Sequence, residues 1–121
     1  MEKYLITDPN YYSNATGVHL TSKQIKKIKK AKDLDLFVII SCHDFTDIEK
    51  ALKDYANAIT YSPIFKTPNK TQPKGINQLE EAIEIFEDIN IFALGGITSN
   101  EQVKKISKTK AYGFASIRYF T

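Results

Sequence analysis

Short apolar runs rich in β-branched residues alternate along this chain with segments of helical periodicity, and this alternation restricts the fold more than any other feature. Strand, helix, strand, helix is typical of a parallel sheet with right-handed crossovers, so we predict an α/β fold. The run at 36–41 is continuously apolar, which predicts a strand buried on both faces. The six runs are 3–7, 17–20, 36–41, 58–62, 91–94 and 113–117.

Amphipathic segments between these runs predict four helices. Ser22 is expected to open a helix that continues through residue 32, and Asp44 or Thr46 to open the second. The third is expected to begin at Asn77. The fourth is expected to begin at a helix-capping residue, either Ser99 or Asn100.

Two connections stand out by their length. Residues 9–16 are too few for the ~10–12 residues of an ordinary crossover between parallel strands. Residues 63–76 form a long loop that contains three prolines. This loop follows the carboxyl end of a predicted strand, where α/β folds bind their ligands.

Length and composition restrict the class of protein. The 121 residues are expected to form a single domain over 1–121, and 42% of them are apolar, enough for a core. No apolar run approaches the ~18 residues of a membrane span. The single cysteine, Cys42, rules out an internal disulfide framework. We therefore expect a cytoplasmic protein without a membrane partner.

The net charge of +3 is too small to indicate nucleic-acid binding, but the charge is unevenly distributed. Residues 23–32 carry six lysines and no acid, whereas 80–88 carry five acids and no base. No aromatic residue is interleaved with the lysines for base stacking, so a solvated helix face is expected there, not a nucleic-acid site.

The sequence LGGIT at 94–98 predicts a phosphate site. Gly95 and Gly96 follow a buried strand and let the backbone approach a ligand, and the next helix offers N–H groups to an anion. Arg118, the one arginine, ends the following strand, where a guanidinium would bind phosphate. The alternative is a tight turn that simply requires glycine.

Ser41, Cys42 and His43 end the most apolar strand. His43 lies where a strand meets a loop, which suits a general acid or base, although a histidine that only caps the next helix is the alternative. Strand alternation points Cys42 away from both neighbours, so we expect it in the core. His19, between Val18 and Leu20, is expected to be structural.

Residues 62–70, SPIFKTPNK, combine two prolines with a hydroxyl and mobile cations. Thr67 with Lys66 or Lys70 would suit phosphate or pyrophosphate held under a flap. A solvated loop is the alternative interpretation.

Taken in order, YLITD, GVHL, SCH, SPIFKTPNK, ALGGIT and YGFASI resemble the thiamine phosphate synthase/TenI superfamily of TIM barrels, most strongly over 41–117. The resemblance implies that Ser41, Thr67 and Lys70 handle pyrophosphate or substrate. It implies that Gly95 and Gly96 bind a phosphate, and that the histidine of S-x-H, His43, transfers a proton in TenI-type thiazole tautomerases.

The chain also departs from the family pattern. A magnesium-binding aspartate is replaced by Gln24, and only Asp8 could stand in for the other. Hydrated Mg²⁺ is poorly held without two carboxylates, so no cofactor is expected. Half the length of a TIM barrel implies a shortened barrel of about six parallel strands, in which the run at 3–7 is either the family's first strand or its third.

The resemblance therefore implies a shortened TenI-like protein of thiamine metabolism. If the chain is an enzyme, the expected activity is metal-independent thiazole phosphate tautomerisation or a residual transfer reaction of the thiamine phosphate synthase type. The expected partner is a small phosphorylated heterocycle, a thiazole or a pyrimidine phosphate. The alternative is a degenerate, non-catalytic relative that binds a thiamine-precursor phosphate or a protein. An incomplete barrel leaves two sheet edges unpaired, so a homo-oligomer is expected.

Overall fold

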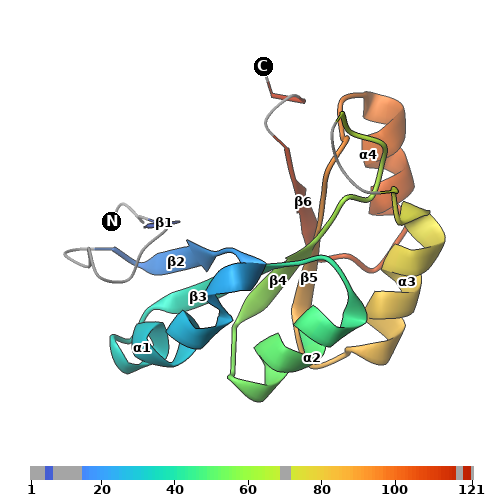
Figure 1. Cartoon of the computed structure of the whole chain (residues 1–121). Coiled ribbons are helices and arrows are strands. Elements are labelled where there is room, and N and C mark those ends of the chain that lie inside the picture. The colour runs from blue at the N-terminus through green and yellow to red at the C-terminus, as the bar shows by residue number, and fades with distance from the viewer. Residues whose placement is uncertain (1–4, 7–14, 69–71, 117–118, 121) are drawn as a thin grey trace. The chain divides into compact units, whose positions relative to one another are not determined.

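A computed structural model describes residues 5–6, 15–68, 72–116 and 119–120 (Figure 1). The chain divides into two compact units, residues 1–59 and residues 60–121. Asp8, Lys70 and Arg118 lie outside the described residues, as does most of the short 9–16 connection.

The first unit is built on three parallel strands in chain order, β1 (Leu5–Ile6), β2 (Gly17–Leu20) and β3 (Phe37–Cys42). The 3-10 helix η2 (Ser22–Lys27) runs into α1 (Ile28–Asp33), and α2 (Phe45–Lys53) follows β3. β4 (Ala58–Tyr61) starts at the end of this unit. The second unit continues with α3 (Gly75–Ile85), β5 (Asn90–Leu94), α4 (Asn100–Ser107) and β6 (Gly113–Ala115).

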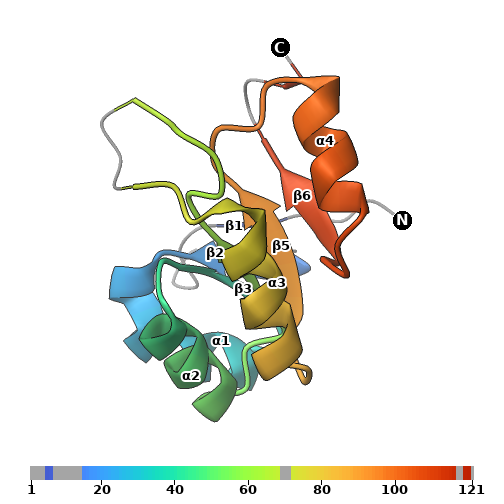
Figure 2. The same ribbon diagram turned by 90° about the vertical axis from the view of Figure 1, so that its right-hand side faces the viewer.

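Each strand run found in the sequence corresponds to a strand, and every pairing with a given register is parallel. In the second unit β5 pairs with β6, with Phe92 opposite Gly113. Figure 2 shows α3 and α4 (yellow and orange) beside these strands. The predicted α/β fold with a helix between successive strands is confirmed.

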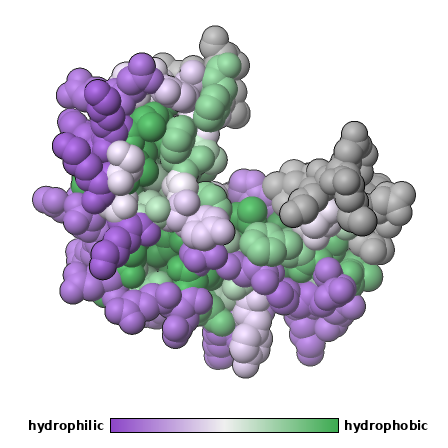
Figure 3. Space-filling view, turned by 180° about the vertical axis from the view of Figure 1, so that it is seen from behind, coloured by the Kyte–Doolittle hydropathy of each residue, from purple (hydrophilic) through white to green (hydrophobic). Residues whose placement is uncertain are grey.

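Burial differs between the two sides of β3 and of β5, whereas β4 is buried on both sides. In β3, Val38, Ile40 and Cys42 are fully buried, whereas Phe37 remains 44% exposed. The expectation that 36–41 is buried on both faces was therefore wrong: only one side is fully covered. Figure 3 shows apolar surface (green) between polar side chains (purple) on one face of the molecule.

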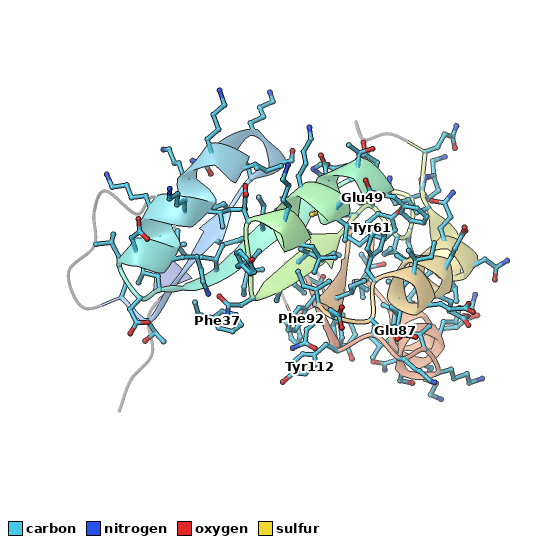
Figure 4. All side chains as sticks on the ribbon, turned by 90° about the horizontal axis from the view of Figure 1, so that it is seen from below. Phe37, Glu49, Tyr61, Glu87, Phe92 and Tyr112 are labelled. Atoms are coloured by element: carbon cyan, nitrogen blue, oxygen red, sulfur yellow. The ribbon has the colours of Figure 1, made fainter. Side chains whose placement is uncertain are left out.

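The second unit has the same asymmetry. Ile91 and Ala93 of β5 are buried, but Phe92 is only half-buried and packs edge-on against the exposed Tyr112, with ring centroids 5.2 Å apart. These two labelled rings project from the strand region in Figure 4. Within the described part of the chain, no helix is both long enough and apolar enough to cross a membrane.

Two predicted helix starts are confirmed and two were wrong. Asp44 caps α2 by accepting the Asp47 N–H at 2.7 Å, and Ser99 caps α4. The first helical segment is capped by Thr21 instead of Ser22. α3 begins at Gly75, two residues before Asn77, because the Gly75 N–H donates to the Ile64 carbonyl.

Candidate active site

The loop after β4 is bonded to the turn after β5. The Ile64 N–H donates to the Leu94 carbonyl at 2.9 Å, and the Phe65 N–H donates to the Gly95 carbonyl at 3.0 Å. Two segments about thirty residues apart in the sequence thus continue the strand-like pairing past the end of β5. Figure 2 shows the long loop and this turn at the same end of the second unit.

Gly95 and Gly96 make this close approach geometrically feasible. Both have positive φ, 103° and 70°. A Cβ atom would lie 2.7 Å from the Pro63 Cα at Gly95 and 2.6 Å from the Lys66 carbonyl oxygen at Gly96. The structure therefore shows one requirement for both glycines: they admit the backbone of the 63–66 loop. Phosphate binding by their N–H groups remains a prediction.

The chain after β6 returns to the same turn. The Ser116 hydroxyl donates to the Ile97 carbonyl at 2.7 Å and accepts the Tyr119 N–H at 3.1 Å. The Tyr119 hydroxyl donates to Asn100 Oδ1, at the start of α4, at 2.6 Å. Arg118 belongs to this segment by sequence, although its own position is not described.

Ser116 and Tyr119 were missed by sequence reasoning. A serine directly after the last strand was the available signal, because a hydroxyl at that position can reach the neighbouring strand's turn. Ser99 completes a capping box, in which its hydroxyl accepts the Gln102 N–H and Gln102 Oε1 accepts the Ser99 N–H at 3.2 Å. These contacts fix the N-terminus of α4 beside the glycine turn.

Thr67 carries a buried hydroxyl that has no hydrogen-bond partner among the described residues. An unpaired buried hydroxyl costs about 1–3 kcal/mol, so its retention in the predicted phosphate loop favours a ligand contact. Farther along, Lys74 Nζ lies 5.4 Å from the centroid of the Tyr61 ring. The backbone N–H of Lys74 donates to the Pro63 carbonyl. Lys66 is exposed.

In the first unit, His19 and Ser41 form the best-defined polar pair. His19 Nε2 lies 2.9 Å from Ser41 Oγ. The register pairs His19 with Ile39, so Ser41 lies two residues further along β3 on the same face. Burial lowers the pKa of His19 below its ordinary 6.5, which favours the neutral ring at neutral pH. The sequence indicated Ser41 but assigned His19 to structure alone.

His43 follows β3 and is exposed. Its backbone N–H donates to Asp47 Oδ2 at 3.0 Å, which ties the turn to the first turn of α2. His43 therefore lies in a short turn whose backbone is fixed by β3 on one side and by the hydrogen bond to α2 on the other. Its role as a base remains a prediction.

Cys42 is fully buried, as predicted. Burial raises the pKa of its thiol far above the ordinary value, and the nearby carboxylates of Asp47 and Asp44 raise it further. Because the thiolate is the reactive form, the burial of Cys42 disfavours a nucleophilic role in the folded chain.

The position where the resemblance implies a magnesium-binding aspartate does not fit a metal ion. Gln24 is a neutral amide, and its Oε1 accepts the Thr21 N–H at 3.0 Å within a helix cap. Among the described residues, no three His, Cys, Asp or Glu side chains are grouped to hold a metal. Gln24 therefore stabilises the start of a helix and offers no negative charge to a divalent cation.

Parallel strands alternating with helices, with polar groups at the carboxyl ends of the strands, define a β/α protein of the TIM-barrel type. The chain belongs to the thiamine monophosphate synthase family, whose model matches residues 8–120. The resemblance read from the sequence is thus confirmed.

The curated relatives that this chain matches are longer. A protein of Aquifex aeolicus with the provisional name thiamine-phosphate synthase 2 is 38% identical over 109 residues, which cover 88% of this chain and 58% of that protein. The thiamine-phosphate synthase of Prochlorococcus marinus strain AS9601 is 33% identical, over 87% of this chain and 30% of its own length. The chain thus spans between about a third and little more than half of the length of these two relatives.

Solved structures confirm the fold. A structure described as native KDPGal superposes with a TM-score of 0.75 at 18% identity, over 93% of this chain and 53% of that chain. A thiamine phosphate pyrophosphorylase from Pyrococcus furiosus superposes with a TM-score of 0.64 at 16% identity, over 96% of this chain and 85% of that chain.

Proposed function

We propose that this chain catalyses a metal-independent proton transfer on a small phosphorylated heterocycle of thiamine metabolism, as in a thiazole phosphate tautomerase. Family membership supports the substrate class. The observation that carries the proposal is the 2.9 Å contact between His19 Nε2 and Ser41 Oγ, because it places a neutral imidazole and a hydroxyl at the strand end that leads into His43.

The chemistry needs a base and then an acid of similar pKa, which a histidine supplies. In the proposed reaction His43 takes a proton from a ring carbon of the substrate and returns a proton to another ring atom. The electron pair of the broken C–H bond moves through the ring, so nothing is oxidised or lost. The His19–Ser41 pair orients the heterocycle by hydrogen bonding.

A phosphate anchor is the second requirement. We assign it to the N–H groups of Gly95 and Gly96, to Arg118 and to the unpaired hydroxyl of Thr67. Charge-assisted hydrogen bonds of this kind are the strong ones. Arg118→Ala should weaken binding of a thiazole phosphate by about 1.5–3 kcal/mol, and an unchanged Kd would remove Arg118 from the site.

The test is a tautomerase assay with a thiazole phosphate carboxylate, run with and without EDTA. His43→Gln should lower the rate by about 10²–10⁴-fold. Glu49→Gln, a change at an exposed position of α2, is the matched control and should retain the parent rate. Activity abolished by EDTA would overturn the metal independence, and parent-like activity of His43→Gln would overturn the base.

A non-catalytic phosphate-binding protein is the second candidate. The observation that favours it is Gln24, which takes the place of a carboxylate and serves a helix cap. Ligand-observed NMR separates the two: saturable binding of thiazole phosphate without turnover would establish this candidate in place of the first.

A further inference from the structure

Two helical segments carry opposite charge, and neither takes part in the site described above. Residues 23–32 contain six lysines and no acid, and residues 80–88 contain five acids and no base. Charge of one sign on a helix face repels itself, so each segment would be stabilised by a surface of the opposite sign.

The basic face consists of Lys23, Lys26 and Lys29, all exposed on η2 and α1. Ile28 and Ala31 are fully buried on the side that packs on the unit. The three-residue repeat of the 3-10 helix places Lys23 and Lys26 on one side, and Lys29 follows at the same spacing. Figure 4 shows side chains of this segment extending away from the ribbon, with nitrogen ends outermost.

The acidic face consists of Glu81, Glu84 and Asp88, all exposed along and just beyond α3. Leu79 and Ala82 are fully buried on the opposite side of this helix. The structure gives these three carboxylates no ion pair within the described part of the chain.

The position of these acids on the helix is electrostatically unfavourable. They lie toward the C-terminus of α3, where the helix dipole is negative, and the last turn of α3 has no basic residue. α1, α2 and α4 each have two lysines in the last turn. α3 is therefore the described α-helix whose C-terminal end would gain most from a cation supplied from outside.

The surroundings of α3 also provide space and an apolar contact. A hollow of about 700 Å³ lies beside it, lined by Glu80, Glu84 and Glu87 with Lys108 and Lys110. Glu84 lines this hollow together with the two lysines, whereas Glu81 and Asp88 do not line it. Ile85, which lies between Glu84 and Asp88 in the chain, is 53% exposed.

We propose that the basic face of one copy of this chain docks on the acidic face of a second copy. The two faces match in charge, three against three. A nucleic acid would satisfy the basic face alone and would be repelled by the acidic one.

The test uses two charge-reversed variants. The first combines Lys23→Glu, Lys26→Glu and Lys29→Glu; the second combines Glu81→Lys, Glu84→Lys and Asp88→Lys. In sedimentation velocity at micromolar concentration and low salt, the parent should associate. Each variant alone should sediment as one copy of 13.8 kDa. An equimolar mixture of the two should associate again, because each presents the face that the other lost.

Ionic strength provides an independent measurement. Raising salt from about 25 mM to about 500 mM should weaken the association at least tenfold, because screening acts on exposed charges. Glu49→Lys with Glu101→Lys is the control, since it adds positive charge at exposed positions that belong to neither face and should leave association unchanged. Circular dichroism of every variant verifies that its helices are intact.

Three results would overturn the proposal. One is a parent that stays a single copy at low salt. Another is association that survives in both variants and in high salt, which would indicate pairing through the sheet edges instead. The last is a parent that binds single-stranded DNA through the basic face without self-association.

Discussion

A Cβ atom on Gly96 would lie 2.6 Å from the carbonyl oxygen of Lys66. Backbone cannot yield as a flexible side chain does, and the φ of 70° at Gly96 is itself unfavourable for any residue with a Cβ. Gly96→Ala should therefore lower the free energy of unfolding by about 2–4 kcal/mol, measured by urea denaturation.

Gly75→Ala is the matched control for this prediction. Gly75 has a similar φ of 78°, but a Cβ there would meet nothing within 4 Å. The expected loss is about 1 kcal/mol, from the backbone conformation alone. Equal losses at Gly75 and Gly96 would contradict the packing role of the 63–66 loop.

Thr67→Val should stabilise the free protein and weaken its ligand binding. Removing a buried hydroxyl without a partner removes its desolvation cost, so the free energy of unfolding should rise by about 1 kcal/mol. Isothermal titration with thiazole phosphate should show a higher Kd. Thr60→Val removes a second hydroxyl that is buried and has no partner among the described residues, and it should stabilise the protein without changing the Kd. A stabilised Thr67→Val variant with unchanged Kd would place Thr67 outside the phosphate site.

Stability should fall as the pH drops below about 6.5. Burial lowers the pKa of His19 from its ordinary 6.5, so below that pH the unfolded chain binds a proton that the folded chain resists. Stability then decreases with falling pH until the folded-state pKa is reached. His19→Gln should show a shallower decrease in denaturation experiments between pH 7.5 and pH 5. A slope identical to the parent would contradict the burial of an uncharged His19.

Cys42 should react slowly with thiol reagents in the native protein. Its side chain is fully buried, and burial raises the pKa of the thiol, so both access and thiolate fraction are low. The rate of labelling by 5,5′-dithiobis(2-nitrobenzoic acid) should rise by orders of magnitude in denaturing urea. Rapid native labelling at neutral pH would show that β3 opens readily.

Local patterns were sufficient to predict the elements of this fold. Apolar runs of strand length and their alternation with amphipathic segments need no tertiary information, because each element must bury one side. Asp44 and Ser99 were identifiable as helix caps because a cap bonds N–H groups only two or three residues away. The start of α3 was missed because the Gly75 N–H donates a hydrogen bond to the carbonyl of Ile64, at the opposite end of the long loop.

The sequence by itself therefore determined the order of strands and helices, the caps that depend on neighbours in the chain, the burial of Cys42 and the family. Only the tertiary structure decided which distant groups meet. The His19 and Ser41 side chains are in contact although 22 residues separate them in the chain. Gly96 packs against the backbone of Phe65 and Lys66. Such contacts depend on strand register and loop closure, which arise from the packing of the whole unit and leave no periodic signal in the chain.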